Sequence, residues 1–98
     1  MEIIEPLKKG FTVYGKSGCF NCTKTKRLLE TNNLSFIVVD CDDYIIEDKN
    51  LFLSLMKDKI GKSYNTFPMV FNNSIFIGGY YETNEYVEKT LLSFEDKF

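Results

Sequence analysis

The order of short apolar runs along this 98-residue chain constrains its fold more than any other feature. Residues 11–14 alternate weakly between apolar and polar side chains, which predicts a strand. After the loop of residues 15–18, a helix is predicted to turn Cys22, Leu28 and Leu29 toward the core. It should end at Asn32-Asn33, since asparagine tolerates the left-handed conformation. Residues 36–39 are apolar on both faces, which predicts a central strand covered from both sides.

The second half of the chain predicts a helix, a hairpin and a final helix. The helix spans about residues 45–60 and is ended by Gly61, with one apolar stripe formed by Ile45, Phe52, Met56 and Ile60. Residues 69–71 and 75–77 are predicted strands, joined by a turn at residues 72–74. The final helix has one apolar face, made of Val87, Leu91, Phe94 and Phe98. A short opening helix is expected to carry Ile3, Ile4 and Leu7 and to end near Gly10.

This order predicts an α/β fold built from two units. A βαβ unit with parallel strands comes first, and an antiparallel ββα unit follows. One mixed four-stranded sheet with helices on both faces satisfies both units. Because a second core would need more chain, residues 1–98 are expected to form a single domain.

Composition excludes several function classes. The chain has no histidine, so Ser-His-Asp and Cys-His nucleophile pairs and histidine-ligated zinc or haem cannot form, and no metal site is expected. A net charge of −2 gives no general attraction to nucleic acid. No apolar run approaches the ~20 residues of a membrane span, and the N-terminus does not look like a signal peptide. The expectation is therefore a cytoplasmic protein whose thiols stay reduced.

The strongest chemical signal is the pair Cys19 and Cys22 at the predicted junction of the first strand and the first helix. This spacing puts both side chains on the same side of the first helical turn, within reach of a disulfide. The helix dipole and Lys16 both favour a thiolate there, so Cys19 is the predicted nucleophile. Cys22 lies further inside the helix and is the predicted resolving thiol.

Two other readings of the cysteine pair remain open beside the redox one. The pair could be half of a zinc site, or two ordinary buried cysteines. Cys41 follows the second predicted strand with no activating neighbour, so it is expected to be a passive small residue; a regulatory or intermolecular disulfide is the alternative. The segment from Pro6 to Leu29 contains no acidic residue, which indicates either a solvated basic face or a positive field around the cysteines.

Three motifs in order resemble those of the glutaredoxins, in the thioredoxin-like superfamily. Residues 14–22 resemble the active-site loop, residues 66–71 the Thr-Val-Pro segment, and residues 77–81 the Gly-Gly segment. The resemblance implies a cis bond before Pro68, a substrate-binding backbone at Phe67, and the γ-glutamyl end of glutathione near the last helix. The implied glutathione-binding residues are Lys16, Thr66, Phe67, Pro68, Gly79, Tyr80 and Tyr81.

The chain departs from the family pattern at several places. Family members usually have Cys-Pro-Tyr-Cys, whereas this chain has Phe20 and Asn21 between the cysteines. The loop of residues 61–65 is longer than usual, and Glu82 only approximates the acidic residue that follows the Gly-Gly segment. The family's polar glutathione-binding residue from the preceding helix has no clear counterpart in the sequence.

The resemblance implies a dithiol glutaredoxin that uses glutathione to reduce protein disulfides and protein–glutathione mixed disulfides. A glutathione-independent redoxin fed by a flavoprotein reductase is one alternative. A [2Fe–2S] cluster carrier is another, because replacing the active-site proline can permit a bridged cluster in this family. The implied partners are glutathione and disulfide-containing proteins, ribonucleotide reductase among them, and the expected state is a monomer with no nucleic-acid or membrane partner.

Overall fold

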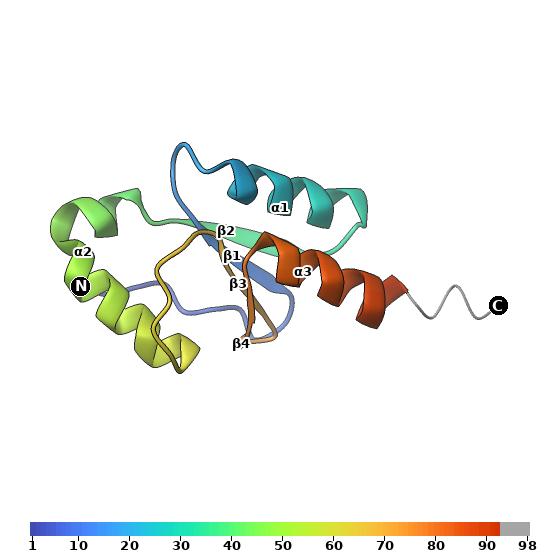
Figure 1. The fold of residues 1–98 in the computed structure, drawn as a ribbon. Coiled ribbons are helices and arrows are strands. Elements are labelled where there is room, and N and C mark those ends of the chain that lie inside the picture. Colours follow the sequence, from blue (N-terminus) through green and yellow to red (C-terminus); the bar gives the residue numbers. More distant parts are fainter. Residues whose placement is uncertain (93–98) are drawn as a thin grey trace.

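A four-stranded mixed sheet organises the computed structural model, which describes residues 1–92 (Figure 1). The strands lie in the order β2-β1-β3-β4. Along the chain the elements are β1 (Phe11–Gly15), α1 (Phe20–Thr31), β2 (Phe36–Asp40), α2 (Asp42–Ile60), β3 (Met69–Asn72), β4 (Ile75–Gly78) and α3 (Tyr80–Tyr86), which continues as a π-helical segment, Val87–Leu92.

The pairing of the strands confirms the two predicted units. β1 and β2 are parallel, and α1 crosses between them. β3 pairs antiparallel with both β1 and β4. The β3–β4 hairpin closes through Asn73 and Ser74, both with positive φ (53° and 70°), as a tight two-residue turn requires.

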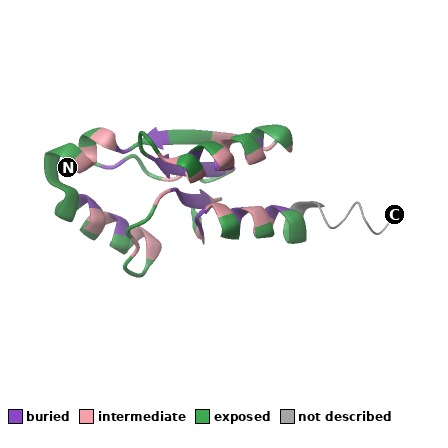
Figure 2. Cartoon of the chain, turned by 45° about the horizontal axis from the view of Figure 1, so that its top comes forward, coloured by how far each residue is buried: buried purple, intermediate pink, exposed green. Residues whose placement is uncertain are grey.

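Helices cover both faces of the sheet, as predicted. On one face Tyr14, Met69 and Phe71 pack against α2 through Phe52 and Met56. On the other face the alternate strand residues contact α1 and the end of α3, in a cluster of Phe11, Val13, Leu29, Val70 and Val87. Figure 2 shows the central strands as buried and the outward sides of the helices as exposed. The alternation of side chains along β1 and β3 therefore supplies two cores, one for each helical layer.

The predicted opening helix is wrong, because residues 1–10 contain no helix. Their backbone groups find partners outside the segment: the Tyr14 hydroxyl donates to the Ile4 carbonyl at 2.6 Å, and the Leu7 N–H donates to the Thr12 hydroxyl at 2.8 Å. Ile3 is buried in the α2-face core. Tertiary contacts therefore replace the local hydrogen bonds that a helix would have supplied.

The prediction that residues 36–39 form a central strand is also wrong. They lie in β2, which is an edge strand. Ile37 is 36% and Val38 45% exposed, while Val39 is buried. The βαβ crossover places β2 beside β1, and no other described segment pairs with its outer edge. The apolar run consequently reflects β propensity as much as burial.

The predicted middle helix is confirmed in position but is not continuous. α2 begins at Asp42, three residues before the predicted start, and its backbone is broken at Asp48 (φ −163°, ψ 93°). The Asp48 carboxylate accepts the Leu51 N–H at 3.0 Å and so caps the second part. Gly61 ends α2 in the left-handed conformation (φ 93°), as predicted.

The last helix is confirmed as far as the structure describes it. Val87 is buried against the α1-face core. The side chain of Leu91, and Phe94 and Phe98, lie outside the described residues. Among residues 1–92, no helix has both the length and the apolar composition that crossing a bilayer requires.

Candidate active site

The two cysteines of the predicted site lie at the junction of β1 and α1. Gly18 turns the chain with a positive φ of 70°, and Cys19 then caps α1 in an extended conformation (φ −100°, ψ 104°). The Cys19 Sγ accepts the Cys22 N–H at 3.1 Å. A sulfur at this position takes up one of the unpaired N–H groups of the first helical turn, which favours its negative form.

Cys19 and Cys22 form a disulfide, with their Cα atoms 5.2 Å apart. This pairing agrees with the dithiol reading. Within residues 1–92 no group of three histidine, cysteine or carboxylate side chains is arranged to hold a metal ion, so nothing completes the alternative zinc site there. The redox reading is the one that the arrangement favours.

The two sulfurs differ in their surroundings. Cys19 is partly exposed, whereas Cys22 is only 4% exposed. Gly15 permits this burial, because a Cβ placed on it would lie 3.3 Å from the Cys22 Sγ. The exposed sulfur can meet a substrate and the buried one can attack only from within, which fits the predicted roles of nucleophile and resolving thiol.

The loop before Cys19 is tied to the start of α2. The Ser17 N–H donates to the Asp42 carboxylate at 2.9 Å, and the Ser17 hydroxyl donates to its other oxygen. The Ser17 hydroxyl, then its N–H, and then the charge of Lys16 hold the pKa of Asp42 below its ordinary value. Sequence reasoning missed Asp42; the only signal is an acidic residue at a helix start.

The Phe67–Pro68 bond is cis, as predicted from the motif. The Phe67 ring stacks on Phe52 with centroids 6.1 Å apart, and the Lys16 ammonium lies 5.9 Å from the Phe67 ring centroid. These residues place the cis-proline segment beside the basic loop of the site. Lys16, Thr66 and Phe67 line one cavity of about 310 Å³, together with Lys49 from α2.

Lys49 is a second residue that sequence reasoning missed. It follows the break at Asp48, and that break sets which side of α2 it occupies. A 3.6-residue period assumes a continuous helix, so the pattern could not place it. It is a cationic residue of the helix before the cis-proline segment, where the sequence offered no clear counterpart to the family's polar residue.

The Gly-Gly segment meets the cis proline and α1. A Cβ on Gly79 would lie 3.6 Å from the Pro68 carbonyl oxygen, so the two backbones are close. The Gly79 N–H donates to the Glu82 carboxylate at 2.7 Å. Beside it, the Lys24 ammonium lies 4.3 Å from the centroid of Tyr80, 5.4 Å from Phe20 and 5.6 Å from Tyr81; we call these four residues the Lys24 cluster.

The Lys24 cluster links the start of α1 to the start of α3, and two of its aromatic side chains are exposed to solvent. Phe20 is 75% and Tyr81 67% exposed, next to the partly exposed Cys19. Of the predicted glutathione-binding residues, Lys16, Thr66 and Phe67 line one cavity, and Gly79 lies close to Pro68. Tyr80 and Tyr81 lie against Lys24 of α1, the helix that carries Cys22.

Cys41 lies in the α2-face core and is fully buried. Burial, then the charges of Asp40 and Asp42, raises the pKa of its thiol to about 12. Such a thiol carries almost no thiolate at neutral pH, which fits the passive role predicted for it.

Comparison with known proteins agrees with this geometry. A glutaredoxin family model matches residues 11–77. The mitochondrial glutaredoxin-2 of Homo sapiens is 32% identical over 72 residues, which are 74% of this chain and 42% of that protein. The chain therefore spans less than half the length of the curated relatives it matches.

Two solved structures share the fold at 26–28% identity. Glutaredoxin 1 of Francisella tularensis, complexed with cacodylate, has a TM-score of 0.72 and 28% identity, over 84% of this chain and 95% of that one. The holo form of glutaredoxin C1 from Populus tremula x tremuloides has a TM-score of 0.68 and 26% identity, over 93% and 81%.

Fold and site together define a thioredoxin-like protein with a dithiol Cys-x-x-Cys centre. Within that class, the chain belongs to the glutaredoxin family.

Proposed function

We propose that this chain is a glutathione-dependent thiol–disulfide oxidoreductase that reduces protein disulfides and protein–glutathione mixed disulfides. The observation that carries the proposal is the Cys19–Cys22 pair, with one sulfur partly exposed and the other buried at the first turn of α1. Membership of the glutaredoxin family supports the same chemistry.

The reaction needs two exchanges. The Cys19 thiolate attacks one sulfur of the substrate disulfide, forming a Cys19–substrate disulfide and releasing the other sulfur as a thiolate that takes a proton. The Cys22 thiolate then attacks the Cys19 sulfur, which frees the reduced substrate and leaves the Cys19–Cys22 disulfide. Two glutathione molecules restore the dithiol and leave as glutathione disulfide, so atoms and electrons balance.

The cavity beside the cis proline is the proposed place for the glycine end of glutathione. Lys16 and Lys49 line it and supply two positive charges for a carboxylate. The backbone of Phe67, next to Pro68, would pair with the extended tripeptide in the manner of an added strand. Lys49 therefore takes the role of the polar residue that the sequence did not identify.

The γ-glutamyl end would lie against the other side of the site, at Gly79, Tyr80 and Tyr81. Glu82 already accepts the Gly79 N–H, so a ligand would reach the backbone of Tyr80 and Tyr81 more readily than that N–H. Glutathione carries a net charge of about −1 near neutral pH. The basic residues of the loop and of α1 should speed its encounter with Cys19.

The decisive experiment is a coupled assay with glutathione and its reductase on two substrates, a glutathione mixed disulfide and a protein disulfide. Cys19→Ser should abolish both activities. Cys22→Ser should keep most of the first, since a second glutathione can resolve the intermediate, and lose more than about tenfold of the second, because a neighbouring thiol far exceeds free thiol in effective concentration. Equal loss of both in Cys22→Ser would contradict glutathione dependence and favour a redoxin fed by a flavoprotein reductase. Substituting thioredoxin reductase in the assay separates the two directly.

A second candidate is a [2Fe–2S] cluster carrier, favoured by one feature. Phe20 replaces the usual active-site proline, and the poplar relative was solved in a holo form. Cys19 is the exposed sulfur that would hold such a cluster with glutathione, while Cys22 competes for it by forming the disulfide. A brown colour with visible absorbance after anaerobic purification supports this candidate.

The setting of the protein is also proposed. We expect a cytoplasmic monomer that meets glutathione and disulfide-containing proteins, with ribonucleotide reductase among the family's partners. Gel filtration and assays on candidate disulfide proteins test these expectations.

A further inference from the structure

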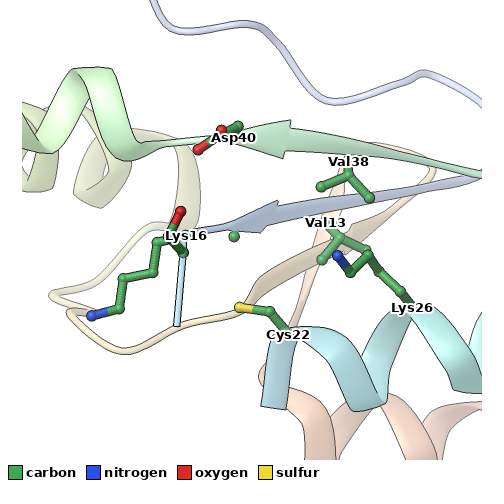
Figure 3. Close-up of a pocket in the computed structure, with 8 residues that line it drawn as sticks. Val13, Lys16, Cys22, Lys26, Val38 and Asp40 are labelled. Carbon is green, nitrogen blue, oxygen red and sulfur yellow. The ribbon is translucent and has the colours of Figure 1, made fainter. Parts of the chain in front are cut away.

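A cavity of about 200 Å³ reaches the buried Cys22 sulfur between α1, the first two strands and the loop before Cys19. Its walls are the residues of β1 and β2 that face α1, and two residues one helical turn apart on α1 (Figure 3). Val13 pairs with Val38, and Gly15 with Asp40, so both pairs present the same face of the sheet. Cys22 and Lys26 of α1, with Lys16 and Ser17 of the loop before Cys19, complete the lining.

The cavity exists because β2 is an edge strand. α1 covers Val13 on the central strand but leaves Val38 45% exposed. The gap between α1 and β2 stays open, and Gly15 contributes no side chain to fill it. Its volume and its charged lining suit several water molecules, each of which occupies about 30 Å³ in the liquid.

Lys26 points into this space. Figure 3 shows its side chain running back from α1 toward the strands, beside Val13 and Cys22. A long helical side chain leans toward the N-terminus of its helix, which directs Lys26 over the preceding turn, where Cys22 lies. Within residues 1–92 no carboxylate lies within ion-pair distance of its ammonium.

Three other charged groups lie on the elements around Cys22. Lys16 comes from the loop and extends away from the cavity in Figure 3. Asp40, at the end of β2, accepts the Asp42 N–H at 2.9 Å. Asp42, from α2, is bound by Ser17 at the rim. Lys26 is thus the cation that α1 contributes to the cavity lining. It favours a thiolate at Cys22, whereas the two carboxylates disfavour one.

We propose that Lys26 is a positioning residue for the resolving step, in which its ammonium stabilises the Cys22 thiolate across the cavity. The inference deepens the proposed function, since it rests on Cys22 as the resolving thiol. Cys22–SH loses its proton to water in the cavity, and the thiolate attacks the Cys19 sulfur of the mixed disulfide. The S–S bond to the substrate breaks, and the departing thiolate takes a proton from solvent.

The need for such a group follows from burial. A thiol removed from water ionises less readily, because the low dielectric disfavours its charge. In this molecule burial raises the pKa of Cys41, near two carboxylates, to about 12. Cys22 is nearly as buried but must form a thiolate for the reaction to finish. A nearby cation lowers that cost directly.

The test measures thiolate formation at Cys22 by its ultraviolet absorbance against pH, in Cys19→Ser protein without glutathione or substrate. Adding Lys26→Met should raise the midpoint by about half a unit or more, which means at least about a threefold loss of thiolate near neutral pH. Lys26→Arg should restore the midpoint. Asp40→Asn should lower it, while its amide oxygen can still accept the Asp42 N–H.

Arg27→Met is the matched control, because it removes one positive charge from the neighbouring, exposed position of the same helix. It should leave the midpoint where the Cys19→Ser parent has it. Equal midpoints in Lys26→Met and Arg27→Met overturn the inference. The Cys22→Ser assay on a protein disulfide tests the proposed function separately. If that variant loses activity but Lys26→Met does not shift the midpoint, the proposed function stands and only the role of Lys26 is removed.

Discussion

Cys22 and Cys41 are two buried cysteines at the same end of the sheet, and their side chains lie on its opposite faces. The Cys41 N–H donates to the Gly15 carbonyl at 2.9 Å, and Gly15 also packs against the Cys22 sulfur. Cys22 lies on α1 and faces the sheet, beside a cavity that Lys26 also lines. Cys41 faces the aromatic core beneath α2, with carboxylates nearby. Burial alone therefore does not decide what a thiol can do; the charge and the space beside it do.

The same contrast extends to the two faces as wholes. The α2 face contains several aromatic rings. The ring centroids of Tyr14 and Phe71 lie 5.4 Å apart, and Phe52 stacks on both Tyr44 and Phe67. The buried cluster of the α1 face has one ring, Phe11, among Val13, Leu29, Val70 and Val87, and the edge of this face is open at Val38. We infer that one face chiefly stabilises the fold while the other leaves room for the chemistry of the cysteines.

The largest expected effect is a difference in thiol reactivity. In reduced Cys19→Ser protein, Cys22 should react with iodoacetamide at least about a hundredfold faster than Cys41 at about pH 8, because reaction requires thiolate. Timed alkylation followed by peptide mass spectrometry measures both rates in one sample. Rates within tenfold of each other would remove the distinction between the two faces.

The next prediction compares an alanine variant that loses activity with one that loses stability. Cys22→Ala should lower activity on a protein disulfide by more than about tenfold. Cys41→Ala should leave that activity unchanged and lower the free energy of unfolding by about 1–2 kcal/mol, since it leaves a small cavity in the aromatic core. Denaturant titration of both reduced variants supplies the second comparison. Loss of activity in Cys41→Ala would show that its role is not passive.

A smaller effect is expected at Gly15, which contacts both cysteines. Gly15→Ala places a methyl group 3.3 Å from the Cys22 sulfur, closer than ordinary contact. The sulfur or α1 must shift, which should cost about 1 kcal/mol of unfolding free energy. The control Gly18→Ala has open space around its Cβ, so any loss there comes from its positive φ alone. An unchanged Cys22 reactivity in Gly15→Ala would mean that the sulfur is not held by this contact.

How far the sequence could predict this molecule depends on the range of the interactions. Local signals succeeded: the turn at Asn73 and Ser74, the left-handed Gly61, and the paired cysteines at a helix start all follow from short-range geometry. Predictions that needed the neighbours failed. The first ten residues pair with Tyr14 and Thr12 instead of forming a helix, and these partners are not visible in a local pattern.

The candidate site divides in the same way. Cys19, Cys22 and the cis bond before Pro68 could be predicted from motifs. Lys49 could not, because the break at Asp48 changes the direction of the residues that follow it. Lys26 is not among the residues of its helix that the pattern turns toward the core. Its position over Cys22 depends on β2 being an edge strand, which the apolar run of residues 36–39 did not reveal.

The smallest expected effect concerns the contact that holds the site loop to α2. Ser17 holds the pKa of Asp42 below its ordinary value of 3.8, so the carboxylate binds protons more weakly in the folded state than in the unfolded one. Its contribution to stability is therefore present above that ordinary value and is lost as the pH falls through the lower, folded value. Asp42 is partly exposed, so solvent screens the contribution.

Asp42→Asn should accordingly lower stability slightly at neutral pH and not at all in strong acid. The two unfolding curves should converge as the pH falls below the lowered pKa of Asp42, provided that both proteins remain folded there. Ser17→Ala is the partner variant, and the double variant should be no less stable than the worse single one if both act through the same hydrogen bonds. Chemical denaturation across the acid range measures all three. A difference between Asp42→Asn and wild type that stays constant with pH would mean that the carboxylate's charge does not anchor the loop.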